Sequence, residues 1–204
     1  GLANVMVGNA ANNQLNGGSG ADTLIGGRGN DSYIIDNAND MVTERLNEGI
    51  DIVSSSVTYT LSANVENLTL IGTTAINANG NGLANNLKGN TAANRLTGGG
   101  GNDTLDGGTG KNILTGGTGK DIFKLTTTGH IDSITDFVVN DDTIQLENAA
   151  YTKLTTTGTL VAGQFRIGSK ALDANDFVIY NKVTGALLYD ADGKRYLDAI
   201  SSWW

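Results

Sequence analysis

Apolar residues recur nine positions apart along two stretches of this chain, 8–34 and 80–124. Each of these apolar residues is the centre of a three-residue segment, which predicts a short strand with one side chain facing inward. A nine-residue unit cannot bury a single apolar side chain alone, so the units must stack. The pattern predicts a coil of parallel strands around an apolar interior. The inward positions are Leu15, Leu24, Tyr33, Leu87, Leu96, Leu105, Leu114 and Phe123.

A second register, of oxygen-bearing side chains, runs in phase with the apolar one. Asparagine or aspartate stands two residues before each inward position, and glycines dominate the turn that precedes it. Glycines with positive φ let backbone carbonyls approach a common point. If two units complete one coil, turns eighteen residues apart lie side by side on one edge. The oxygen-bearing positions are Asn13, Asp22, Asp31, Asn85, Asn94, Asp103, Asn112 and Asp121.

The composition narrows the kind of partner that such rows of oxygen atoms can bind. The chain has 204 residues with 29 glycines, no cysteine, no proline and a formal net charge of −8. Disulfides and thiolate metal sites are excluded, and the acidic balance argues against nucleic acid and anionic membranes. No apolar run reaches the roughly eighteen residues of a membrane span. The acidic balance favours cations as partners.

Calcium is the cation that suits rows of carboxylates and carbonyls. It accepts roughly six to eight oxygen ligands in flexible geometry. Magnesium demands tighter octahedral geometry, and zinc prefers nitrogen or sulfur ligands, which are scarce in this chain. We therefore expect several Ca²⁺ ions.

Four turns carry the complete motif GGxGxD, at 17–22, 26–31, 98–103 and 116–121. These units resemble the hemolysin-type calcium-binding nonapeptide of RTX proteins, which Gram-negative bacteria export by type I secretion. Segment 36–44 with Gly49 and Asp51 is similar to a common extension of such blocks, and 64–72 to the usual spacer between them. Segments 132–146 and 161–193 are similar to the closing region. The resemblance implies an all-β fold, a parallel β-roll or β-helix that binds calcium.

Pairing at eighteen residues ranks the expected calcium sites. Asp103 with Asp121 is the best pair, because both turns are complete. Asp22 pairs with Asp40, and Asp31 pairs with the neutral Asn13, which predicts a site of half strength. The turn glycines expected at these sites are Gly18, Gly20, Gly27, Gly29, Gly99, Gly101, Gly117 and Gly119.

The remaining oxygen-bearing positions fit calcium less well. The turn that ends at Asn112 offers an amide where a carboxylate is expected, and Lys111 adds a positive charge, so we expect weaker calcium there or none. For Asn85 and Asn94 we favour a metal-free turn closed by side-chain hydrogen bonds. Asp132 and Asp136 are expected to complete the last calcium layer, with an acidic strand–turn surface as the alternative.

The chain is expected to divide into four regions. Residues 1–50 form the first calcium-binding repeat block, 51–79 a strand-rich spacer that continues the coil, and 80–130 the second block. Residues 131–204 alternate strand-like runs and turn signals, which predicts an antiparallel β cap with a possible secretion signal. A cap would cover the open end of the coil, where unpaired strand edges invite association.

The sequence holds no constellation that supports catalysis, so no enzyme is expected. The single histidine, His130, excludes multi-histidine sites, and the glycine-rich turns at 107–112 and 116–121 lack the ending of a phosphate-binding loop. The resemblance implies a secreted or cell-surface calcium-binding module that uses a type I secretion apparatus and folds on calcium after export. The alternative is a calcium-stabilised adhesion or polysaccharide-binding segment with an extracellular glycan as partner. We expect the isolated fragment to be a monomer.

Overall fold

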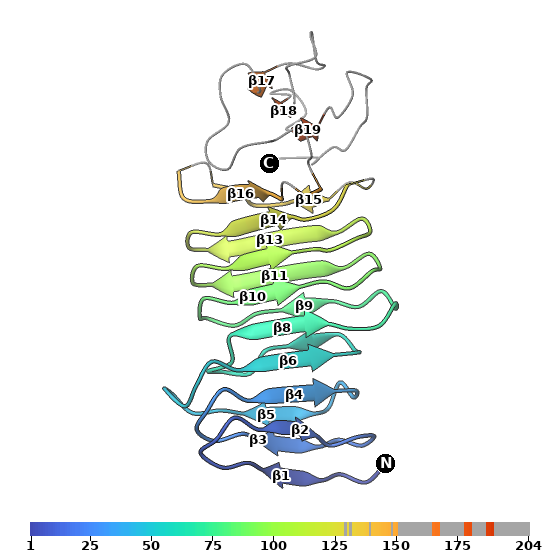
Figure 1. Cartoon of the computed structure of the whole chain (residues 1–204), viewed down its shortest axis with the longest axis vertical. Helices are drawn as coiled ribbons and strands as arrows, with labels where there is room; N and C mark the ends of the chain where they lie inside the picture. The colour runs from blue at the N-terminus through green and yellow to red at the C-terminus, as the bar shows by residue number, and fades with distance from the viewer. Residues whose placement is uncertain are drawn as a thin grey trace.

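The computed structural model describes residues 1–128, 130, 132–138, 140–147 and 149–150, and three further strands, β17 (Phe165–Ile167), β18 (Val178–Tyr180) and β19 (Leu187–Tyr189). These residues form strands and turns, with no helix among them. The described strands between residues 5 and 146 form a parallel β-solenoid of about eight turns, and its successive coils rise from the N-terminus (Figure 1). The predicted parallel β-roll is confirmed.

One wall of the solenoid is a parallel sheet of eight strands in the order β16-β14-β12-β10-β8-β6-β4-β2. Every neighbouring pair in this wall runs parallel. The strands are β2 (Gln14–Asn16), β4 (Ser32–Ile35), β6 (Ile52–Ser55), β8 (Asn67–Leu70), β10 (Asn86–Lys88), β12 (Thr104–Asp106), β14 (Ile122–Leu125) and β16 (Thr143–Leu146).

The other wall consists of two shorter parallel sheets, in the orders β1-β3-β5 and β15-β13-β11-β9-β7. Consecutive strands along the chain alternate between the walls, so each coil contributes one strand to each. The strands are β1 (Val5–Val7), β3 (Thr23–Ile25), β5 (Met41–Thr43), β7 (Tyr59–Thr60), β9 (Ala78–Asn79), β11 (Arg95–Gly100), β13 (Ile113–Thr118) and β15 (Ser133–Ile134).

The strand register confirms that two nonapeptides complete one coil. Leu105 on β12 pairs with Leu87 on one side and Phe123 on the other, and side-chain hydrogen bonds between neighbouring coils span eighteen residues. Identical positions of every second unit therefore lie directly above one another. The periodic sequence becomes a set of rows along the solenoid axis.

The inward apolar positions fill the space between the walls. Leu24, Tyr33, Leu87, Leu105 and Phe123 are each 0% exposed. Burying a side chain of this size contributes about 1.5–3 kcal/mol. Because each coil adds two such residues, stacking of neighbouring coils supplies the core that a single coil lacks.

The segment between the two repeat blocks continues both walls. β6 and β8 pair in register through Val53 and Leu68, and β7 pairs with β9 through Tyr59 and Ala78. All four of these side chains are buried. The spacer therefore keeps the apolar rows without the glycine-rich turns.

The coil extends beyond residue 130, where the sequence predicted that an antiparallel cap begins. β15 and β16 pair parallel with β13 and β14, because Ile134 and Ile144 occupy the inward positions although the glycine pattern has ended. Further on, β17 pairs parallel with β18, and β18 pairs antiparallel with β19. Most of the predicted cap lies outside the described residues and stays a prediction.

Membrane spanning by a helix finds no support in the described residues. None of them belongs to a helix long and apolar enough to cross a bilayer.

Candidate metal sites

The residues that stand two places before the inward positions form rows that link neighbouring coils, and we call them row residues. In each link, one side-chain oxygen accepts a hydrogen bond from the backbone N–H of the row residue one coil earlier. The first row is Asn4, Asp22 and Asp40, and the second is Asn13, Asp31 and Asp51. The third row is Asn85, Asp103, Asp121 and Asp142, and the fourth is Asn94, Asn112 and Asp132. The bonds measure 2.6–3.0 Å.

The second oxygen of several carboxylates in these rows is buried and has no hydrogen-bond partner. These inner oxygens are Oδ2 of Asp22, Asp31, Asp51, Asp103 and Asp121, together with Oε2 of the neighbouring Glu44. Within the described part of the chain, no lysine or arginine forms an ion pair with any of them. A buried carboxylate without a partner is costly, so each such oxygen calls for a proton or a cation.

The first glycine of each complete turn makes room for the inner oxygen. A Cβ added at Gly98 would overlap Asp103 Oδ2, and one at Gly116 would overlap Asp121 Oδ2. The second and fourth positions of the turn that ends at Asp103, Gly99 and Gly101, have φ of 109° and 98°. This left-handed backbone strongly favours glycine, so the motif GGxGxD follows from the packing around the carboxylate.

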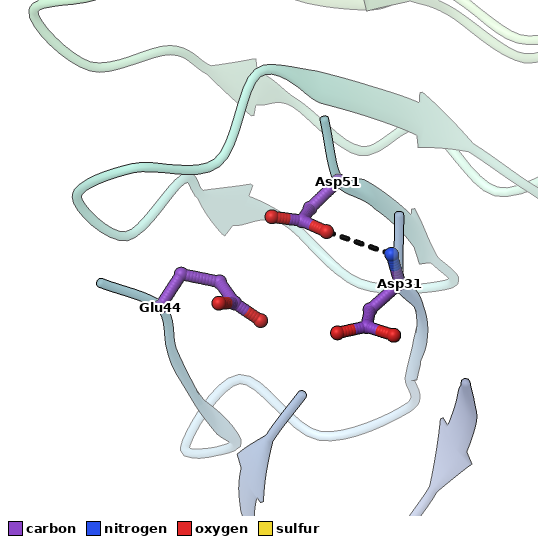
Figure 2. Close-up of side chains that lie close together, drawn as sticks. All are labelled: Asp31, Glu44 and Asp51. Atoms are coloured by element: carbon purple, nitrogen blue, oxygen red, sulfur yellow. Dashed lines mark hydrogen bonds between the residues drawn. The ribbon is translucent and has the colours of Figure 1, made fainter. Parts of the chain in front are cut away.

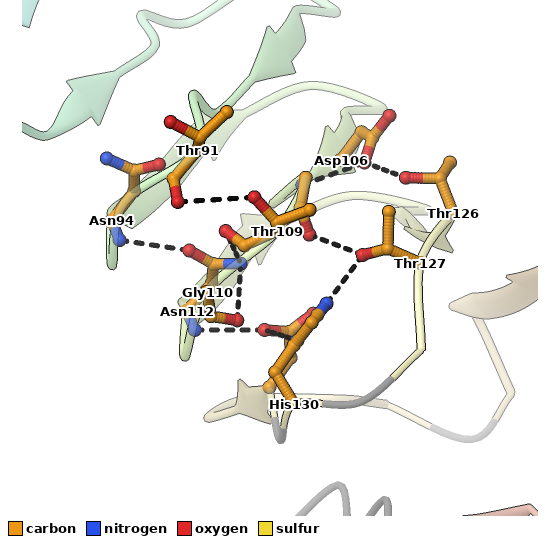
Figure 3. A network of polar contacts seen from close by, with 11 residues as sticks. Thr91, Asn94, Asp106, Thr109, Gly110, Asn112, Thr126, Thr127 and His130 are labelled. Carbon is orange, nitrogen blue, oxygen red and sulfur yellow. Dashed lines mark hydrogen bonds and ion pairs between the residues drawn. The ribbon is translucent and has the colours of Figure 1, made fainter. Parts of the chain in front are cut away.

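Asn112 occupies a row position in which both polar side-chain atoms have hydrogen-bond partners (Figure 3). Its Oδ1 accepts from Asn94 N at 2.9 Å, the same link that Asp103 and Asp121 make. Its Nδ2 lies beside Gly107 and donates to the backbone oxygens of Thr109 and Gly110, at 3.4 and 3.3 Å. Asparagine therefore places an N–H where aspartate places an unpartnered oxygen.

Asn85 and Asn94 also satisfy their amides within the protein. Asn85 Nδ2 donates to Val65 O and Glu66 O at 3.3 and 3.2 Å, and Asn94 Nδ2 donates to Ile76 O at 2.6 Å. Both Oδ1 atoms accept from the backbone N–H four residues earlier. These bonds favour the metal-free interpretation of both turns.

The structure brings the predicted pairs into adjacent coils but distinguishes between them. Asp103 and Asp121 are neighbours in one row, and both keep an inner oxygen. Asp40 lies next to Asp22, yet its Oδ2 accepts from Asp36 N and Asn37 N at 3.3 and 3.1 Å. Asp40 therefore has both oxygens partnered, and the free oxygen of this pair belongs to Asp22.

Asp132 and Asp136, predicted to complete the last calcium layer, have different surroundings at the C-terminal end of the rows. Asp132 continues the row of Asn112, and its Oδ1 lies 3.3 Å from His130 Nδ1. Figure 3 shows His130 beside Thr127. Asp136 accepts from Gly116 N and Gly117 N at 2.9 and 2.7 Å, so both of its oxygens are partnered.

Three acidic residues in or beside the rows were not among the predicted ligands: Glu44, Asp51 and Asp142. Asp142 follows Asp121 in its row and Asp51 follows Asp31, but the spacings are 21 and 20 residues instead of 18. The sequence still contains a short signal despite the longer spacing, because Asp51 and Asp142 each stand two residues before an inward apolar residue. Glu44 has no such signal.

Burial changes the acidity of several row carboxylates. Burial raises the pKa of Asp103 to about 6, with a smaller contribution from the charge of Asp121. Burial likewise raises the pKa of Asp51 to about 6, and the charges of Glu66, Asp31 and Glu48 act in the same direction. In both cases a hydrogen bond from a backbone N–H partly opposes the shift.

We expect the calcium-free chain to gain β-structure when the pH is lowered from about 7.5 to 5. In the folded chain, the carboxyl groups of Asp103 and Asp51 have a pKa of about 6 and are protonated at pH 5. In the unfolded chain the same two groups are ionised at pH 5. Their contribution to stability is therefore present at low pH and lost as the pH rises through 6. Far-UV circular dichroism of calcium-depleted protein measures the change. The double variant D51N/D103N should respond less, and equal responses would contradict the assignment.

These features define a class of protein: a parallel β-solenoid whose glycine-rich turns hold rows of buried carboxylates. A sequence model described as RTX calcium-binding nonapeptide repeat (4 copies) matches residues 1–33, 79–114 and 88–123. The chain therefore carries RTX calcium-binding nonapeptide repeats in both blocks, and the resemblance seen in the sequence is confirmed. A search of curated proteins finds no match to the chain.

Proposed function

We propose that this chain is a calcium-dependent β-roll module of an exported protein, which folds when calcium binds. The observation that supports this most directly is the contrast between Asn112 and Asp103. At the same place in the turn, Asn112 has an N–H donor bonded to turn carbonyls and Asp103 has a buried oxygen without a partner. A cation between that oxygen and the carbonyls would satisfy both.

The residues that fit such a cation are the carboxylates with inner oxygens and the turns around them. Asp22, Asp31, Asp103 and Asp121 would each contribute Oδ2, and the glycine-rich turns would contribute backbone oxygens. Calcium would supply the positive charge that these rows lack. The donors are all oxygen, which matches the preference of calcium. We propose a structural role for the module, without catalysis.

Folding on calcium binding would suit passage through a secretion channel. In a cytoplasm poor in calcium, repulsion within the carboxylate rows and a net charge of −8 would keep the glycine-rich chain unfolded. Extracellular calcium near about 1 mM would fill sites of the affinity typical for extracellular modules, roughly 10⁻⁴–10⁻³ M. Because the unfolded chain has no preformed site, binding energy becomes folding energy. The RTX repeats support export by type I secretion as the route.

Isothermal titration calorimetry of the chain with calcium tests the binding step. We expect several ions per chain with affinities of roughly 10⁻⁴–10⁻³ M, and a much weaker response to magnesium. The variant D121N should bind fewer ions than the wild type, because Asp121 loses its inner carboxylate oxygen. A chain that takes up no calcium, or that takes up magnesium equally well, would overturn the proposal.

A further inference from the structure

The loop between β5 and β6 brings two acidic residues against a repeat turn. Glu44 follows β5 directly, Asp51 precedes β6, and both face Asp31 at the end of the turn 26–31 (Figure 2). One oxygen from each of the three carboxylates lies within 4.8 Å of the others. All three residues are buried, with exposures of 1% for Asp31, 7% for Glu44 and 1% for Asp51. The group therefore combines side chains from a repeat turn and from a loop without the repeat motif.

Each of these carboxylates uses one oxygen to hold the fold and leaves the other without a partner. Asp31 Oδ1 accepts from Asn13 N at 2.6 Å, and Asp51 Oδ1 accepts from Asp31 N at 2.7 Å. Glu44 Oε1 accepts from the phenol of Tyr33. The second oxygens of all three are buried and make no hydrogen bond. The phenol and the two backbone N–H groups thus orient the carboxylates and leave one buried oxygen of each without a hydrogen-bond partner.

No ion pair within the described part of the chain balances this charge. Among the described residues, no lysine or arginine forms an ion pair with Asp31, Glu44 or Asp51. Glu48 and Glu66 lie close enough to make the local potential more negative. Removing one isolated charge from water already costs several kcal/mol, on the order of the net stability of a domain, and here three carboxylates converge. The arrangement calls for a bound cation.

We infer that Asp31, Glu44 and Asp51 bind one calcium ion at a site that departs from the nonapeptide pattern. The donors are oxygen only, and oxygens on opposite sides of Ca²⁺ lie about 5 Å apart, which accommodates the 4.8 Å span of the group. Gly26 leaves the space open, since a Cβ there would overlap Asp31 Oδ2 and Glu44 Oε1. The pairing expected from the sequence, Asp31 with the neutral Asn13, would offer one carboxylate, whereas this site offers three.

The site joins the first repeat block to the coils that follow. Asp51 directly precedes β6, which pairs with β4 beside Asp31, and Glu44 directly follows β5 of the opposite wall. The loop 44–51 has no glycine-rich repeat turn to fix its position against the neighbouring coil. A cation bound by Glu44 and Asp51 would fix it there. The inference shares the metal with the proposed function but adds two ligands that no repeat contributes.

Terbium luminescence can report on this site through Tyr33, whose hydroxyl contacts Glu44. Terbium substitutes for calcium and emits when a nearby tyrosine is excited. We expect the full chain to show sensitised emission that calcium displaces, and we expect the variant Y33F to lose the part of this emission that arises at the three-carboxylate site. E44Q and D51N should also lose this emission, and calorimetry should count one calcium ion fewer in each. Both substitutions remove a charge while keeping an oxygen that can accept the existing hydrogen bond.

Two controls separate this inference from the proposed function. D36N removes one negative charge from an exposed turn of the same block and should leave emission and stoichiometry unchanged. D121N removes a distant repeat ligand and should lower stoichiometry while keeping the emission. If E44Q and D51N bind as much calcium as the wild type, the three-carboxylate site is wrong although the repeat sites stand. If the wild type binds no calcium, both proposals fail together.

Discussion

Removal of calcium at neutral pH is expected to abolish most of the β-sheet signal of this chain. Six buried carboxylate oxygens of the described residues have no hydrogen-bond partner, and without a cation their charges repel one another. The 29 glycines add a large loss of conformational entropy on folding. A site exposed to calcium at about ten times its Kd contributes about 1.4 kcal/mol, so several such sites together approach the net stability of a typical domain.

Far-UV circular dichroism during a calcium titration from chelator measures this effect. We expect a cooperative transition from coil to β-structure with calcium, and no comparable transition with magnesium at the same ionic strength. A chain that is already folded in chelator at pH 7.5 would show that calcium is dispensable for the fold. The adhesion-scaffold alternative would then explain the module better than folding after export.

Exchanging aspartate and asparagine between two turns should exchange their calcium dependence. D103N gives the third row an amide that can donate to its own turn carbonyls, as Asn112 does. We expect this variant to bind one calcium ion fewer and to lose less structure in chelator. N112D removes the donor from Thr109 O and Gly110 O and buries a new charge, which costs about 1–3 kcal/mol or more without calcium. It should bind one ion more and require more calcium to fold.

Calorimetric stoichiometry and the calcium midpoint of folding decide the outcome for both variants. The exposed strand position Asn86 provides a matched control, because N86D adds the same charge outside the turns. N86D should leave the stoichiometry unchanged. The proposed role of the inner oxygen is wrong if D103N and N112D shift the stoichiometry in the same direction, or if neither shifts it.

The order of residues was sufficient to predict the solenoid and its regular sites. Leu105 and Asp103 recur in phase because each coil must place one apolar side chain inside and one turn at the edge. A repeat of nine residues leaves few other ways to stack such units. The eighteen-residue pairing of Asp103 with Asp121 followed from counting and is present in the structure. Where the period holds, position in the sequence translates directly into position in space.

Where the nine-residue repeat is interrupted, the spacing between residues in the sequence no longer predicts which of them are neighbours in space. Asp51 and Asp142 belong to rows of carboxylates only because loops of different length return the chain to the same edge. Asp40 and Asp136 look like ligands in the sequence, but backbone N–H groups occupy both oxygens of each. Sequence cannot reveal which donors surround a carboxylate, because some belong to its own turn and others to the neighbouring coil.

Glu44 illustrates this difference most clearly. Its residue type and spacing predict no site, yet the turn after β5 carries it to Asp31 and Asp51, where the phenol of Tyr33 orients it. The repeat pattern determines that the chain coils and that its edges are acidic, because apolar and oxygen-bearing positions recur together. The packing of adjacent coils determines which oxygens remain free for a cation, because a hydrogen bond from one coil to the next satisfies one oxygen and leaves the other.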